Sequence, residues 1–167
     1  HPLLLSLVTH PFAFSIPFIR TVNLLFFVGS ALLIFLTASL LIGKKKTVFL
    51  PLVFVGLFIT SPLVIYYSSV VMKELPGAFF TILTIFFYGM ARKKQTFIFF
   101  LLSALSLTLL FLTKYNYGIV CLSGLLIEYG LLFVMPGTKK LRIFMTISIA
   151  LFVGIFGVWV YRLGGIV

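Results

Sequence analysis

Long apolar runs of close to twenty residues, separated by short polar breaks, most constrain how this chain can fold. Six such runs can be delimited, and they predict helices over about 21–42, 48–72, 75–91, 97–113, 117–135 and 142–160. About twenty helical residues cross the roughly 30 Å hydrocarbon core of a bilayer, and a helix satisfies its own backbone hydrogen bonds there. The runs therefore predict an all-α fold, a polytopic transmembrane helical bundle with about six transmembrane helices.

The scarcity of charge supports the same class. Only 9% of the residues are charged and 62% are hydrophobic, which is too little charge to cover the surface of a soluble domain. The net charge of +11 could suggest a nucleic-acid partner, but the basic residues gather in the breaks and form no basic amphipathic face. The positive-inside rule explains them without any partner. We expect an integral, multi-pass membrane protein that binds membrane lipid and no nucleic acid.

The breaks alternate in charge, and this alternation predicts the topology. Three breaks carry three basic residues each, and they contain Lys44 to Lys46, Arg92 to Lys94, and Lys139, Lys140 and Arg142. The two breaks between them carry only the Lys73-Glu74 pair and Lys114. If every run crosses once, the rule places the basic loops 43–46, 92–94 and 136–142 in the cytoplasm and the other two breaks on the outer side.

The first twenty residues differ from the rest. Pro2, Pro11 and Pro17 divide this stretch into pieces too short to span, because each proline removes a helical hydrogen bond. We expect residues 1–20 to form an outer juxtamembrane segment in the interface, and residues 1–167 to form a single transmembrane domain.

Candidate chemistry gathers at the two outer breaks. Glu74, one of two carboxylates in the chain, is either a solvated loop acid beside Lys73 or a carboxylate that orients a polar substrate at the membrane surface. Lys114 stands beside two tyrosines and an asparagine, in Lys114-Tyr115-Asn116-Tyr117, and could hold a phosphate against the interface. The alternative for Lys114 is an ordinary snorkelling lysine in an aromatic belt.

Other polar positions carry less. Glu128 lies within an apolar run, where an ionisable residue is a functional candidate, although pairing with the cluster at 92–94 would give it a structural role. His1 and His10 are too few to predict a metal site. Cys121 is the single cysteine and lies in an apolar run, so we expect ordinary packing there.

Several short strings follow one another in a recognisable order. They are His1-Pro2-Leu3, Ile19-Arg20, Ser61-Pro62, Tyr66-Tyr67-Ser68, Met72-Lys73-Glu74-Leu75-Pro76-Gly77 and Leu112-Thr113-Lys114-Tyr115. Together they resemble the membrane domain of the GT-C type glycosyltransferases, the dolichyl-phosphate-mannose-protein mannosyltransferase and aminoarabinose transferase-like group (glycosyltransferase family 39-like). The resemblance covers nearly all of residues 1–135.

This resemblance implies a function and a set of site residues. The chain would be part of a membrane glycosyltransferase that transfers a sugar from a polyprenyl- or dolichyl-phosphate-linked donor to an acceptor on the outer or lumenal side. Glu74 would be the catalytic-site acid, and the substrate-binding residues would be Lys114, Tyr115, Arg20, Lys73 and His1. The lipid-linked sugar would be a substrate, and no bound cofactor is implied.

The same resemblance implies that the chain is a fragment. The principal catalytic acid of the group lies in an outer loop upstream of the His-Pro string, so we expect it in a missing remainder of the same polypeptide. The alternative is a non-enzymatic polytopic protein, such as a small transporter or an assembly subunit. A transporter would place polar groups near mid-membrane, where Glu128 and the Pro62 kink are the candidates.

Overall fold

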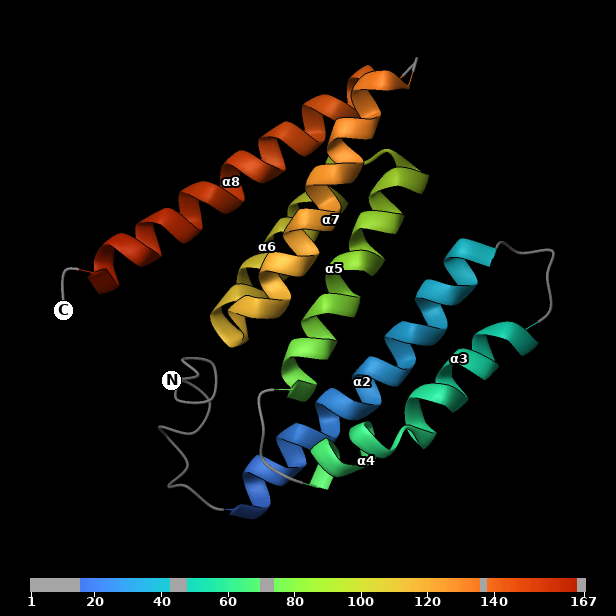
Figure 1. Cartoon of the computed structure of the whole chain (residues 1–167). Helices are drawn as coiled ribbons and strands as arrows, with labels where there is room; N and C mark the ends of the chain where they lie inside the picture. Colours follow the sequence, from blue (N-terminus) through green and yellow to red (C-terminus); the bar gives the residue numbers. More distant parts are fainter. Residues whose placement is uncertain (1–15, 43–47, 70–73, 136–137, 165–167) are drawn as a thin grey trace.

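The computed structural model of the chain describes residues 16–42, 48–69, 74–135 and 138–164 (Figure 1). Every regular element within these ranges is an α-helix, which confirms the all-α prediction. The helices are α2 (Ile16–Ile42), α3 (Phe49–Thr60), α4 (Pro62–Ser69), α5 (Glu74–Lys94), α6 (Phe97–Thr113), α7 (Tyr115–Val134) and α8 (Lys139–Gly164).

Four of these helices are long and apolar enough to cross a membrane, and their spans are Arg20–Ile42, Glu74–Lys94, Tyr115–Val134 and Lys139–Val158. The helices α3 and α6 are apolar but shorter, with 12 and 17 residues. On length and composition, four helices therefore qualify as spans, where the sequence predicts about six. Four such helices identify the chain as a membrane protein.

The predicted helical segment over 48–72, which contains Pro51 and the Ser61-Pro62 kink, is divided in two at Ser61. This residue is extended, with φ −61° and ψ 122°, and α4 begins at the proline that follows it. The ring of Pro62 clashes with a helical conformation of the preceding residue, so the helix stops there. By contrast, Pro51 lies in the first turn of α3, where its missing N–H breaks no helical hydrogen bond.

The beginning of α2 corrects a second boundary. The helix starts at Ile16, so the predicted juxtamembrane segment over 1–20 is shorter than expected. Pro17 falls in the first helical turn, a position that tolerates proline. The remainder of that segment, residues 1–15, lies outside the described residues.

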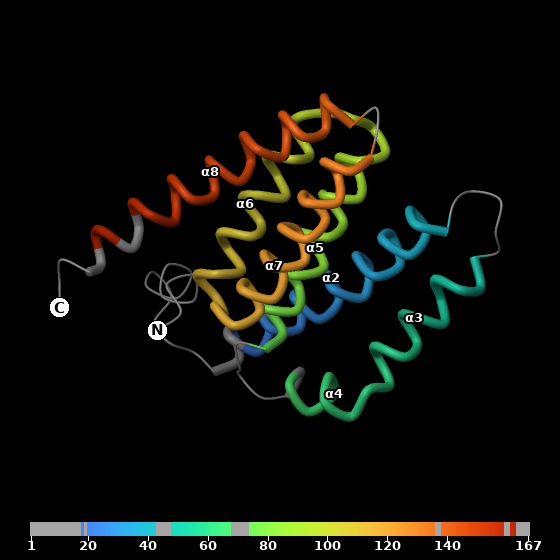
Figure 2. The backbone as a smooth tube through the Cα atoms, turned by 45° about the horizontal axis from the view of Figure 1, so that its top comes forward, coloured from blue at the N-terminus to red at the C-terminus, as the bar shows by residue number. Residues whose placement is uncertain are grey.

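The central helices alternate in direction. α5 and α7 run the same way, and α6 returns between them (Figures 1 and 2). α2 runs parallel to α5 in close contact, since a Cβ on Gly29 would lie 2.8 Å from Cε2 of Phe79 and a Cβ on Gly89 would lie 2.9 Å from Cδ2 of Leu40. Glycine at these two positions lets the helices approach.

This arrangement gives the bundle two chemically different ends. The starts of α5 and α7 meet the end of α6 at what we call the Glu74 end. The end of α5, the start of α6, the end of α7 and the start of α8 meet at the opposite end, which we call the basic end. The described basic residues there are Arg92, Lys93, Lys94, Lys139, Lys140 and Arg142.

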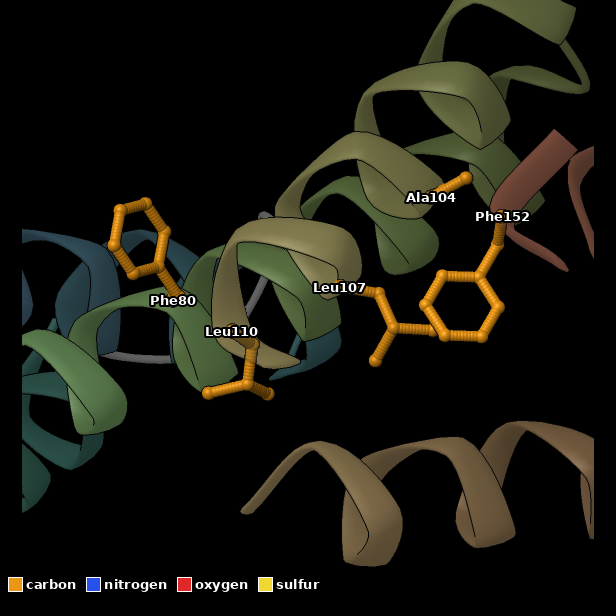
Figure 3. Packing of buried hydrophobic residues seen from close by; sticks show 5 residues of the cluster. All are labelled: Phe80, Ala104, Leu107, Leu110 and Phe152. Carbon is orange, nitrogen blue, oxygen red and sulfur yellow. The ribbon is translucent and has the colours of Figure 1, made fainter. Parts of the chain in front are cut away.

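Two buried clusters hold α6 at the centre of the bundle. The first lies toward the Glu74 end, and Figure 3 shows its members Phe80, Ala104, Leu107, Leu110 and Phe152. The second, toward the basic end, consists of Ala91, Phe100, Leu132, Leu141 and Met145. The first cluster contains residues of α5, α6 and α8, and the second contains residues of α5, α6, α7 and α8. The shortest of these four helices, α6, therefore contacts each of the others.

Polar side chains are buried while large apolar ones face outward, as expected where lipid is the solvent. Ser103 and Thr84 are buried between α6 and α5, and the Ser103 hydroxyl donates to the Thr84 carbonyl at 3.1 Å. In contrast, Val120 is 72% exposed and Leu25 is 67% exposed. Hydroxyl groups inside and aliphatic groups outside indicate a surface that meets hydrocarbon.

Candidate functional site

An ion pair joins two helix ends at the Glu74 end of the bundle. Glu74 is the first residue of α5, and Lys114 is the single residue between α6 and α7. The Lys114 Nζ donates to the Glu74 Oε1 at 2.5 Å, and each side chain is 24% exposed. The fold therefore brings together a cation and a carboxylate that are 40 residues apart in the chain.

The turn between α6 and α7 fixes the position of Lys114. Its backbone is extended (φ −151°, ψ 95°), its N–H donates to the Leu110 carbonyl at 2.7 Å, and its carbonyl accepts from the Gly118 N–H at 3.2 Å. Gly118 is necessary for so tight a turn, because a Cβ there would lie 2.5 Å from Cδ2 of Phe111. Lys114 is thus held by backbone bonds from both helices.

An aromatic ring covers the lysine. The Lys114 Nζ lies 4.7 Å from the centroid of the Tyr117 ring, which is a cation–π distance. Gly77 makes room for this arrangement, since a Cβ at that position would lie 2.9 Å from Cδ2 of Tyr117 and 3.5 Å from Cβ of Lys114. The first turn of α5 therefore supplies both the carboxylate and the space into which the ring packs.

The electrostatics keep this lysine charged. The hydrogen bond to Glu74 raises the pKa of Lys114 above its ordinary value, while partial desolvation acts in the opposite direction. A lysine ammonium has three donors, and Glu74 accepts from one of them. Lys114 therefore stays protonated at neutral pH and has donors left for an anionic oxygen.

Two more polar residues, Asn23 and Arg20, lie at this end on α2. Asn23 is buried, and its Nδ2 donates to the Tyr67 carbonyl at 3.1 Å, which ties α2 to the end of α4. Arg20 lies three residues before Asn23 on α2 and is exposed. Because α2 and α5 run parallel, with Phe26 of α2 packed against Phe79, Arg20 belongs to the same end as Glu74.

The structure treats the other predicted substrate-binding residues differently. Tyr115 is 65% exposed, and the ring over Lys114 belongs to Tyr117 instead. The spacing could have indicated this, because residues three apart on a helix share a face. Lys73 and His1 lie outside the described residues.

A second ion pair lies toward the basic end. Arg92, near the end of α5, donates through Nη1 to Oε1 of Glu128 on α7. The side chain of Arg92 is 41% exposed and that of Glu128 is 26% exposed. This contact is the one that the structural interpretation of Glu128 expects, since the carboxylate within the apolar run is neutralised by a cation from the helix end.

A largely apolar groove of about 780 Å³ lies between α5 and α7. On α5 it is lined by residues such as Ala78 and Ile85, and on α7 by residues such as Val120 and Gly124. Tyr117 lines it at the Glu74 end, and Tyr88 and Glu128 line it at the other end.

Within the described ranges, no group of three or more His, Cys, Asp and Glu side chains is placed to hold a metal ion. Comparisons of the chain with family models, with curated proteins and with solved structures gave no match.

Proposed function

We propose that the chain is part of a membrane glycosyltransferase that transfers a sugar from a polyprenyl-phosphate-linked donor. The observation that carries this proposal is the Lys114–Glu74 pair, held at a helix junction where lipid and water meet and covered by Tyr117. A sugar on a polyprenyl phosphate has its tail in the bilayer and its anomeric carbon at the water boundary. A fixed cation at this level can meet its phosphate without the donor leaving the membrane.

The reaction assigns separate roles to the two residues. The acceptor hydroxyl oxygen forms a bond to the anomeric carbon, and the bond from that carbon to the phosphate oxygen breaks. The electron pair leaves on the lipid phosphate, whose developing charge Lys114 stabilises through its remaining donors. Glu74 keeps the hydrogen bond from one Nζ–H and so positions the ammonium for the phosphate.

The acceptor proton requires a base. The resemblance of the chain to the GT-C group puts this base in an outer loop upstream of His1, so the proposal assigns it to the remainder of the polypeptide. Arg20, Tyr115, Lys73 and His1 remain substrate-binding candidates from that resemblance, and of these Arg20 and Tyr115 are among the described residues.

The proposed topology has six crossings, with the basic loops in the cytoplasm. α6 joins the basic end to the Glu74 end, and its 17 residues extend roughly 25 Å at 1.5 Å per residue. The 12 residues of α3 and the 8 of α4 together extend roughly 30 Å. If α6 and the α3–α4 segment each cross the membrane once, the basic breaks and the nearly neutral breaks fall on opposite sides, in agreement with the positive-inside rule.

Sugar transfer from a lipid-linked donor tests the site directly in membranes that contain the full-length protein. Lys114→Ala and Glu74→Gln should each lower transfer. Lys114→Ala should have the larger effect, because it removes the cation that stabilises the negative charge on the leaving phosphate. Lys140→Gln is the matched control, since Lys140 also lies over an aromatic ring, 5.5 Å from the centroid of Phe144, but at the basic end. Undiminished transfer in both site variants would contradict the site assignment.

The non-enzymatic alternative makes a different demand. A transporter needs a polar group free to bind its cargo within the membrane, and Glu128 was the acidic candidate. The contact with Arg92 gives Glu128 a structural role that requires no cargo. Ion-dependent uptake into vesicles, lost in Glu128→Gln and retained in Lys114→Ala, would favour this alternative over the transferase.

A further inference from the structure

We propose that Arg142 and Lys139, at the start of α8, bind the headgroup of one anionic phospholipid from the leaflet at the basic end. The guanidinium and the ammonium hold the phosphate, and the lipid stands against the exposed ring of Phe133 on α7. This site lies at the opposite end of the bundle from Lys114 and is independent of the proposed sugar transfer.

The Arg142 guanidinium lies at the boundary between protein and lipid. Its Cζ is 5.3 Å from the centroid of the Phe133 ring, which is a cation–π distance. Phe133 is 58% exposed near the end of α7, so the ring beneath the cation faces the surrounding lipid. The spanning part of α8 begins at Lys139, which puts Arg142 within one turn of the end of a spanning helix. The charge is therefore held beside the lipid at the level of the membrane surface.

Lys139 adds a second cation on the same side of α8. Residues three apart on a helix are neighbours on its surface, so Lys139 and Arg142 face the same way. Three residue steps extend roughly 4.5 Å along the axis, and the headgroup layer on each side of the hydrocarbon core is about 5–8 Å thick. Both cations therefore fit at the level of a single headgroup.

The two carboxylates of the chain are already paired with other cations. Glu74 is paired with Lys114 at the other end of the bundle, and the partner of Glu128 is Arg92. Within the described residues, the buried Nε of Arg142 also has no hydrogen-bond acceptor. A phosphate accepts two parallel bonds from one edge of a guanidinium, so an anionic headgroup supplies both the negative charge and an acceptor.

Lys140 provides an internal comparison, because it follows Lys139 in sequence but lies on another side of α8. Its Nζ is 5.5 Å from the centroid of the Phe144 ring. That ring packs on α6, with its centroid 5.5 Å from that of Phe97, so Lys140 covers the side of α8 that meets α6. Lys139 and Lys140 carry the same charge at nearly the same depth, and this separates a specific site from a diffuse attraction.

Photolabelling of the full chain in nanodiscs tests the site. The probe is phosphatidylglycerol with a diazirine at the glycerol end of one acyl chain, and phosphatidylcholine with the same chain is the headgroup control. We expect phosphatidylglycerol to label peptides that contain Phe133 or Arg142 at least about fivefold more strongly, the ratio that one basic contact provides. Equal labelling by the two lipids would overturn the proposal.

Three single variants distinguish the site from the general basicity of this end. Arg142→Gln and Lys139→Gln should each lower the preference about fivefold, whereas Lys140→Gln should leave it unchanged. Lys139 is exposed, so its substitution tests the site without disturbing the packing of α8. An equal loss in Lys140→Gln would overturn the proposal, because the basic end would then act only through its total charge. Loss of the preference when inorganic phosphate is added at constant ionic strength would also overturn it, since a soluble anion would then be the occupant.

Discussion

The contact between Gly118 and Phe111 gives a prediction whose sign and size follow from the structure. A Cβ on Gly118 would lie 2.5, 2.7 and 2.8 Å from three carbons of the Phe111 ring. The ring cannot simply turn away, because its centroid lies 5.2 Å from that of Phe152 and 5.1 Å from that of Phe156. Gly118→Ala should therefore force the turn and α8 apart, at an overpacking cost of about 1–3 kcal/mol.

Gly130→Ala on the same helix isolates this cost. An added Cβ at Gly130 has nothing within 4 Å, so this variant shows only the helix-propensity gain of about 0.5–1 kcal/mol. Gly118→Ala receives the same gain, so the difference in free energy of unfolding between the two variants should equal the overpacking cost, with Gly118→Ala the less stable. Denaturant-induced unfolding in detergent, followed by circular dichroism, measures both. If Gly118→Ala were as stable as Gly130→Ala, the close packing of the α6–α7 turn would be refuted.

Three further predictions concern the connections and ion pairs. Gln95 follows the last residue of α5 and has φ 50°, a left-handed conformation that glycine adopts without steric cost. Gln95→Gly should therefore raise the unfolding free energy by about 1 kcal/mol, and a decrease in thermal stability would contradict the assigned conformation. Arg92→Met should destabilise the bundle more than Glu128→Gln, because it leaves the less exposed partner charged and unpaired, and comparison of the two melting temperatures checks the order. Because the pKa of Lys114 is raised, the stability that its pair with Glu74 contributes is present below the ordinary lysine pKa and is lost as pH rises through the folded value. The stability difference between the natural chain and Glu74→Gln, measured across alkaline pH, should therefore be constant at first and then shrink.

The helices could be predicted from the sequence where both of their ends carry polar markers. The helix over 97–113 is found between the same residues in the structure, because a basic turn precedes it and Lys114 follows it. Over 48–72 the two prolines mark possible interruptions but not their different outcomes, since Pro51 lies within the first turn of α3 and Pro62 begins a new helix. A proline within an apolar run can either kink a membrane helix or end it, and the outcome depends on neighbouring segments that a single run does not reveal.

The site was predictable in its residue types but not in its contacts. Glu74 and Lys114 could be placed at breaks between apolar runs from hydropathy and charge, whereas their contact depends on how α5, α6 and α7 cross. The two tyrosines that follow Lys114 show the same limit, since the sequence places both close to the lysine and the structure brings the ring of Tyr117 over it. The groove between α5 and α7 had no sequence signal, because helices that are apolar on all sides do not show which face is covered.

The short central helix α6 also bears on how the protein enters its membrane. At 17 residues it is at the lower limit for a spanning segment, and it carries hydroxyl groups such as those of Ser103 and Thr108 that are buried only once its neighbours are in place. Only Gln95 and Thr96 separate it from the end of α5, whose Thr84 carbonyl accepts from Ser103. Insertion of α5 and α6 together as a hairpin would give the Ser103 hydroxyl its partner on α5 at once, whereas the Thr108 hydroxyl already donates to the Ala104 carbonyl of its own helix. The helix that organises the finished bundle is thus the one whose biogenesis depends most on the segment made just before it.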